Sequence, residues 1–166
     1  MSDKRNFSIG IDPGQTGALS IFEQDSAGEW HLNTIFDYAS EDILPILREI
    51  IVFHNCCSAC IELVHSAPGQ GVSSTFKFGV NFGWWIGVLE GLGYSYLLVT
   101  PQTWQGKLFK SYRSPTGGYI ATTKEVSLKV AKQLFNKDAD KWFSRKKDHG
   151  RSDAALIGWY GILQIQ

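Results

Sequence analysis

Hydrophobic and polar positions alternate over the first part of the chain, as is typical of β-strands. The segment 7–12, FSIGID, places large apolar residues at every second position, separates them by serine and glycine, and ends at Asp12. Small residues at the alternate positions leave room for a helix on one face of such a strand. Two more apolar segments, 18–22 and 30–35, are joined by the polar segment 24–28. The pattern predicts an antiparallel meander of three strands.

The middle of the chain changes to helical spacing and then returns to a strand. Isoleucine and leucine recur at helical spacing over 43–51, and Ser40 is the expected N-cap residue of this helix. The segment 59–64, ACIELV, is a nearly continuous apolar run broken by Glu62, which predicts a buried strand. A loop is expected over 66–74, where glycine, serine and proline gather.

The second half of the chain predicts one more strand among several helices. A helix from about Phe78 carries Gly79, Gly83 and Gly87 on one very small face, which favours close packing against a partner. A strand is expected at 94–99, and helices are expected at 101–109 after the Thr100 cap, from 122 or 123 to 135, and at 147–163.

This order of elements predicts an α/β layer architecture. The chain has 166 residues, of which 43% are hydrophobic, and it has no internal repeat or long linker. We therefore expect a single domain, residues 1–166, with a sizeable core.

The N-terminal sequence and the cysteines bear on location. The first residues have no apolar leader, and no run of apolar residues is long enough to cross a membrane. Cys56, Cys57 and Cys60 lie too close together for a disulfide framework. Zinc ligation by these cysteines and His54 is an alternative, but we expect buried small side chains in a reducing compartment. The expected location is the cytoplasm, with the host cytoplasm or an organelle matrix as alternatives.

Charge is distributed unevenly although the formal net charge is zero. Residues 1–90 contain 4 lysines and arginines against 11 acidic residues, whereas residues 91–166 contain 12 against 5. A basic half is a common feature of proteins that bind polyanions, and it is equally common as a solvated surface.

Three carboxylates stand out by their context. Asp12 ends the first strand, Glu62 lies in the fourth, and Asp153 lies in the last helix. An unpaired charge in apolar surroundings is costly, so a shared cation would compensate all three. Oxygen ligands favour magnesium or manganese over zinc. The alternative is that Asp12 and Asp153 cap a helix or face water.

His149 is the expected fourth member of this set. It lies four residues before Asp153 and therefore on the same helical face, whereas Asp148 is turned away. The alternative is a surface histidine within the basic run RKKDHGR.

Together these residues and their surroundings resemble a known family, the RuvC-type Holliday-junction resolvases, and most closely the chloroplast-like group with its phage and bacterial relatives. The motifs that carry the resemblance run in order over nearly the whole chain: IGIDPGQTGALSI, IELV, FGVNFGWWIGVLEGLG, VTPQTWQGKLF, TTKEVSLKVAKQLF and RKKDHGRSDAALIGWYG. The resemblance implies a ribonuclease H-like fold with a mixed five-stranded sheet flanked by helices. It also implies a homodimer that nicks two opposed strands of a four-way DNA junction.

The same resemblance implies the metal-binding catalytic residues Asp12, Glu62, His149 and Asp153. Bacterial RuvC usually places its last two members three residues apart, whereas the spacing here is four, as in the chloroplast-like group. Lys124 matches a lysine near the scissile phosphate, and its alternative role is that of an exposed lysine at a helix start. Two Mg²⁺ ions are implied per active site, with Mn²⁺ as a substitute and no small-molecule cofactor.

Phosphodiester hydrolysis explains why such a set is needed. One metal activates a water and a second stabilises the leaving oxygen, and ions about 3.5–4 Å apart need a carboxylate between them. Asp12, on a rigid strand, is the candidate bridge. A dimer through the helix Gly79–Leu92 would pair the two nicks, because each chain supplies only one site.

DNA contacts are expected on both sides of this site. Core packing is the alternative for the two phenylalanines in the set. The candidates are Phe76, Lys77, Phe78, Lys107, Lys110, Arg113, Lys146, Lys147 and Arg151.

Parts of the sequence also suggest functions other than junction resolution. IDPGQTG also resembles the phosphate-binding hairpin of actin-like kinases and chaperone ATPases, but those proteins need two such domains. A ribonuclease H-like nuclease for other branched DNA or RNA–DNA hybrids is the main alternative, and a junction-binding protein without activity is another.

Overall fold

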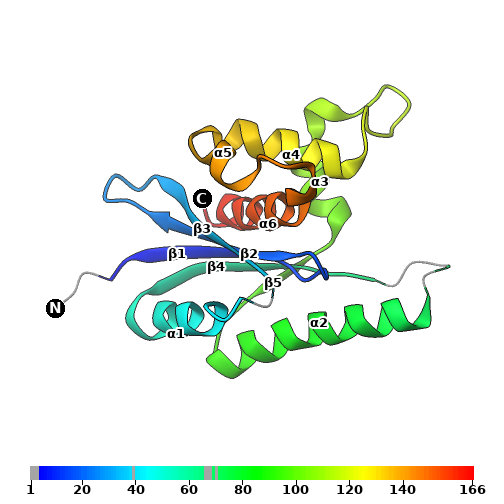
Figure 1. The fold of residues 1–166 in the computed structure, drawn as a ribbon. Coiled ribbons are helices and arrows are strands. Elements are labelled where there is room, and N and C mark those ends of the chain that lie inside the picture. The colour runs from blue at the N-terminus through cyan, green and yellow to red at the C-terminus, as the bar shows by residue number, and fades with distance from the viewer. Residues whose placement is uncertain (1–3, 39, 66–68, 70) are drawn as a thin grey trace.

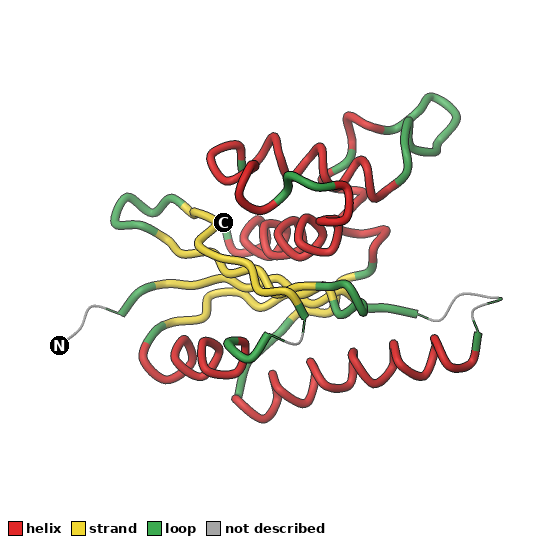
Figure 2. The backbone as a smooth tube through the Cα atoms, in the orientation of Figure 1, coloured by secondary structure: helices red, strands yellow, loops and turns green. Residues whose placement is uncertain are grey.

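The computed structural model describes residues 4–38, 40–65, 69 and 71–166. Within these residues, five strands form one mixed sheet in the order β3-β2-β1-β4-β5, with helices on both faces (Figure 1). The tube drawing shows the strands as one central layer between two helical layers (Figure 2). The expected order of three strands, helix, strand, helix, strand and final helices is confirmed, as is the expected mixed five-stranded sheet flanked by helices.

The sheet combines an antiparallel and a parallel half. β1 (Asn6–Asp12), β2 (Ala18–Gln24) and β3 (Trp30–Asp37) form the expected meander. β4 (Asn55–Glu62) runs parallel to β1, and β5 (Leu97–Val99) runs parallel to β4. β1 is therefore central, and the ends of β1 and β4 lie at the same edge of the sheet.

The helices divide between the two faces of the sheet. α1 and α2 cover one face, and α6 lies on the other face beneath α3, α4 and α5 (Figure 1). The helical bounds are α1 (Ile43–Phe53), α2 (Val72–Leu92), α3 (Pro101–Leu108), α4 (Thr123–Leu134), α5 (Ala139–Trp142) and α6 (His149–Ile165), with 3₁₀ turns at Lys110–Tyr112, Asn136–Asp138 and Lys146–Asp148.

Alternation along β1 determines which helix lies against each face. Ile9 and Ile11 belong to the core shared with α1 and α2. Gly10 points the other way, and a Cβ atom on it would lie 2.5 Å from the Cα of Gly158 in α6 and closer still to the backbone of Ala154. Small residues on this face therefore let the backbone of α6 approach β1, as the sequence predicts.

Some element boundaries differ from the expected ones. α2 begins at Val72, so part of the segment expected to be a loop is helical. The expectation was wrong there because hydroxyl and β-branched residues at 72–75 give only a weak helical pattern. Ser40 is not the cap of α1: Asp42 is at the N-cap position, and its backbone N–H donates to the Ser40 hydroxyl at 3.4 Å. β5 has three residues, whereas six were expected.

The three cysteines are free and lie in different surroundings. Cys60 is buried and Cys56 is partly buried, but Cys57 is exposed, against the expectation for all three. The register between β1 and β4 shifts between Phe7 and Ser8, which skips Cys57, so an irregularity in the ladder turns this residue outward.

No helix in the described residues has both the length and the apolar character needed to cross a membrane.

Candidate metal centre

Two of the expected carboxylates end neighbouring parallel strands. Asp12 is the last residue of β1 and Glu62 is the last residue of β4. Ile11 pairs with Ile61 in the parallel ladder, so Asp12 and Glu62 follow at adjacent positions of the two strands. Because side chains alternate along a strand, both carboxylates lie on the face that Gly10 presents to α6.

The start of α6 is packed against the turn that follows Asp12. A Cβ atom on Gly150 would lie 3.2 Å from the Cα of Gly17 and would overlap the carbonyl of Thr16. Only a residue without a side chain fits there. This contact places the first turns of α6, which carry His149 and Asp153, beside the end of β1.

Asp12 is held by the turn that it begins. Its Oδ1 accepts a hydrogen bond of 2.9 Å from the backbone N–H of Gly14. Burial raises the pKa of Asp12 to about 6, although the Gly14 N–H and the charge of Lys124 both act to lower it. The aspartate is therefore costly to ionise without an additional cation.

Glu62 is held by a hydrogen bond from a tryptophan. The indole N–H of Trp104 in α3 donates to Glu62 Oε1 at 2.9 Å. Burial, and next the charge of Asp12, raise the pKa of Glu62 to about 7. The two strand-end carboxylates are therefore close enough to repel each other.

Asp153 joins this pair from α6. Its Oδ1 accepts a short hydrogen bond from the hydroxyl of Ser127 in α4. Burial raises the pKa of Asp153 well above its usual value, Asp12 raises it further, and Glu62 adds to the effect. The electrostatic effects among Asp12, Glu62 and Asp153 show that the fold brings together three side chains that are far apart in the sequence.

Lys124 of α4 lies near His149, the first residue of α6, as well as near two of the carboxylates. Lys124 lies in the first turn of α4, and its charge acts on Asp12, His149 and Asp153. Burial, and next Lys124, lower the pKa of His149, so the imidazole is neutral near pH 7 and has a nitrogen lone pair available for a metal.

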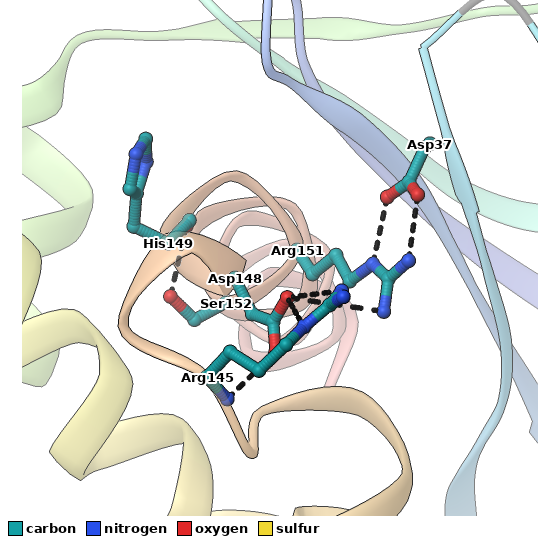
Figure 3. A network of polar contacts seen from close by, with 6 residues as sticks. All are labelled: Asp37, Arg145, Asp148, His149, Arg151 and Ser152. Carbon is teal, nitrogen blue, oxygen red and sulfur yellow. Dashed lines mark hydrogen bonds and ion pairs between the residues drawn. The ribbon is translucent and has the colours of Figure 1, made fainter.

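Asp148 is paired with an arginine, in agreement with the expectation that its side chain is turned away from Asp153. Arg145 donates to both of its oxygens through Nε, and through its NH2 group at 2.8 Å. Figure 3 shows His149 on the side of the helix start that is remote from this ion pair. Asp148 is therefore paired with Arg145, whereas the role of His149 as a ligand beside Asp12, Glu62 and Asp153 stays a prediction.

Arg151 is also engaged in an ion pair. It holds Asp37 at the end of β3 with two hydrogen bonds of 2.7 and 2.6 Å (Figure 3). The network of Arg145, Asp148, Arg151 and Asp37 borders a cavity of about 390 Å³ that also contacts Lys147 and the turn after Asp12. The expected DNA contact by Arg151 stays a prediction, and Asp37 already pairs with the guanidinium that would make it.

The other candidate DNA contacts lie in three places. Lys107, Lys110 and Arg113 are exposed on α3 and the segment after it, and Lys146 and Lys147 are exposed on the 3₁₀ turn before α6. Phe76 is 72% exposed, so core packing does not explain it, while Phe78 is partly buried. A second cavity, of about 380 Å³, is lined by Gln15, Tyr38, Phe76, Lys77, Val80 and Asn81.

The donor set fits a hard divalent cation by its chemistry. Three carboxylates repel one another in partly buried positions, with the ammonium of Lys124 as the cation that acts on two of them. Across residues 4–38, 40–65, 69 and 71–166, no three His, Cys, Asp or Glu side chains form a group that is ready to hold a metal.

Sequence reasoning did not assign roles to the residues that hold the carboxylates. Trp104, Ser127 and Ser152 are buried polar or aromatic side chains in helices. The hydroxyls of Ser127 and Ser152 lie 2.9 Å apart, and Ser152 donates to the carbonyl of His149 at 2.8 Å. Contacts between distant helices leave no local pattern, although a serine on the apolar face of α4 was a usable signal.

Comparison with known proteins agrees with the resemblance found in the sequence. No family model matches the chain. The chain is 29% identical over 102 residues, 61% of its length, to the chloroplastic Holliday junction resolvase MOC1 of Chlamydomonas reinhardtii. It spans only 10% of the length of that relative.

Solved structures of resolvases share the fold. A Thermus thermophilus RuvC structure matches with a TM-score of 0.58 and 17% identity, over 96% of this chain and 97% of RuvC. RuvC from T. thermophilus in complex with a Holliday junction substrate matches with a TM-score of 0.57 and 16% identity, over 92% and 89% of the two chains. The yeast mitochondrial resolvase Ydc2 matches with a TM-score of 0.52 and 16% identity, over 98% of this chain and 80% of Ydc2. The expected resemblance to RuvC-type resolvases is confirmed.

Proposed function

We propose that this protein is a structure-selective DNA endonuclease that resolves four-way junctions by paired, symmetric nicks. The observation that carries the proposal is the meeting of Asp12, Glu62 and Asp153 at one edge of the sheet, where their charges oppose one another. The sequence likeness to a chloroplastic resolvase and the shared fold of RuvC and Ydc2 support the same substrate.

The proposed cofactor is Mg²⁺, two ions per site, with Mn²⁺ as a substitute. Asp12, Glu62, Asp153 and His149 would hold the ions, and Asp12 at the centre of the sheet is the candidate bridge. Divalent ions held there supply the charge that activates a water and stabilises the transition state of phosphodiester hydrolysis.

The side chains around the carboxylates have separate tasks. The backbone N–H of Gly14 orients Asp12, the indole N–H of Trp104 orients Glu62, and the hydroxyl of Ser127 orients Asp153. Lys124 is the one member of this group that brings positive charge, which suits it to the negative charge that develops on the phosphate oxygens.

The exposed cations would guide the DNA arms to this edge. Lys107, Lys110 and Arg113 lie on the α3 side, and Lys146 and Lys147 lie at the start of α6. Phosphate contacts of this kind release counterions, so junction affinity should fall steeply as salt rises. Phe76, largely exposed at the start of α2, would stack on a base at the crossover.

A homodimer through α2 would bring two such sites to one junction. Gly79, Gly83 and Gly87 are exposed, and a Cβ atom built on each of them meets no other atom within 4 Å. Val80, on the same helix, is 52% exposed. An open glycine face beside exposed apolar residues suits close contact with a second copy, and a symmetric dimer pairs the nicks.

The experiment offers three substrates to the purified protein in Mg²⁺: a four-way DNA junction, an RNA–DNA hybrid and a linear duplex. We expect symmetric nicks in two opposed strands of the junction and no cleavage of the others. Preferential cleavage of the hybrid would show a ribonuclease, and equal cleavage of all three would refute structure selectivity.

A further inference from the structure

Trp104 connects the core of the protein to one of the proposed metal ligands. The side chain lies in α3 and is fully buried. Its indole N–H donates to Glu62 Oε1 at 2.9 Å, and its ring packs edge-on against Phe109 with centroids 5.3 Å apart. A rigid, enclosed donor therefore points at a carboxylate that has three rotatable bonds.

Short connections place this donor. Glu62 pairs with Val99, the last residue of β5, and the backbone N–H of Leu63 donates to the Val99 carbonyl at 2.8 Å. α3 begins two residues later at Pro101, with Thr100 as a cap whose hydroxyl accepts from the Thr103 N–H. The position of Trp104 relative to Glu62 is thus determined by the sheet itself.

Other tryptophans in the described residues show that burial alone does not require such an acceptor. The indole nitrogens of Trp85 and Trp142 are buried and have no hydrogen-bond partner. Trp85 is as fully buried as Trp104 but packs against α1 and the opposite face of the sheet. The bond from Trp104 to Glu62 is therefore a specific feature of this edge.

The bond opposes a force that would move Glu62. Asp12 and Glu62 repel each other before any cation is bound, as the electrostatic effect of Asp12 on Glu62 shows. A free glutamate would turn away from its neighbour. A donor on one oxygen holds the side chain in place and leaves the second oxygen for a cation.

We propose that Trp104 is a positioning residue that keeps Glu62 oriented for binding the divalent cation. This inference rests on the proposed function, because it takes Glu62 as a metal ligand. Partners that orient metal ligands in this way typically change metal affinity about 10- to 100-fold when they are removed.

The test compares two substitutions that remove the same atoms from equally buried sites. Trp104→Phe deletes the donor to Glu62, and Trp85→Phe deletes an indole nitrogen that bonds to nothing. Mn²⁺ binding to the protein without DNA is measured by calorimetry, and folding is checked by circular dichroism. We expect Trp104→Phe to weaken Mn²⁺ binding about 10-fold or more and Trp85→Phe to change it less than about 2-fold.

Equal Mn²⁺ affinity in Trp104→Phe and the wild type would overturn the inference, as would an equal loss in both variants. If Trp104→Phe does not fold, Mg²⁺ is titrated into wild-type protein labelled with ¹⁵N-tryptophan. The indole N–H signal of Trp104, assigned by its contact with Phe109, should shift while that of Trp85 stays. A stationary Trp104 signal at saturating Mg²⁺ would refute the proposal.

The two hypotheses fail in different ways. Wild-type protein that binds Mn²⁺ but does not cut junctions refutes the proposed function and leaves the role of Trp104 to be read from the titration. Wild-type protein that binds no Mn²⁺ refutes both.

Discussion

Replacing Asp12 by asparagine should stabilise the metal-free protein while abolishing cleavage. Burial raises the pKa of Asp12 from 3.8 to about 6. The folded state therefore keeps a proton that the unfolded state has already lost, and stability falls as pH rises between these values. Above about pH 6 the full cost of ionising Asp12 is present, and an uncharged asparagine avoids it.

The size of this effect follows from the two pKa values. A change in pKa from 3.8 to about 6 corresponds to about 3 kcal/mol at pH 8, as an upper bound. At pH 4.5 the same calculation gives a cost of about 1 kcal/mol to the stability of the folded protein. For a chain of this length, about 3 kcal/mol corresponds to roughly 6–12 °C in melting temperature. Relief of the repulsion on Glu62 and Asp153 acts in the same direction.

Thermal unfolding in EDTA, from pH 4.5 to pH 8, measures the effect. The melting temperature of Asp12→Asn should exceed that of the wild type by an amount that grows with pH. Adding Mg²⁺ should raise the melting temperature of the wild type but not of the variant. Asp25→Asn is the matched control, because a hydrogen bond from His31 lowers the pKa of this exposed aspartate and its loss gives no gain at pH 8. An advantage of Asp12→Asn that is absent, or the same at both pH values, would refute the reasoning.

Three further predictions concern the packing, the chemistry and the assembly. Gly10→Ala should lower the free energy of unfolding by about 3 kcal/mol or more, because the new Cβ meets the backbone of α6; denaturant titration that shows no loss would contradict this packing. Lys124→Ala should slow junction cleavage about 10²- to 10³-fold with binding nearly unchanged, while Lys129→Ala, exposed on the same helix, should have little effect on the single-turnover rate. If the proposed dimer forms through α2, Gly83→Leu should convert it to a monomer in light scattering, and a dimer that persists would exclude the α2 face.

The strand pattern near the N-terminus was enough to predict the centre of the fold. Alternation at 7–12 identified both faces of β1 and the small residues that admit α6, because period-two patterning is imposed locally by a half-covered strand. Asp12 and Glu62 stood out as candidate site residues because of their context. Each is a carboxylate in a segment that is otherwise apolar.

Other features depend on contacts that no local pattern records. The start of α2 was not predicted because residues 72–75 have little helical propensity of their own. The apolar pattern that predicts the helix begins only at about Phe78. The pairing of Arg151 with Asp37 joins residues 114 positions apart, so the basic run around it appeared freer than it is. Trp104 and Glu62 are 42 positions apart, which similarly hid their hydrogen bond.

The central claim is that Asp12, Glu62, His149 and Asp153 hold divalent cations at one edge of the sheet. The most direct measurement is an anomalous difference map from a crystal of the protein soaked in Mn²⁺. We expect two Mn²⁺ peaks, both contacted by Asp12 and shared among the other three side chains. A map with no peak in contact with Asp12, or with Mn²⁺ bound only at another site, would contradict this claim.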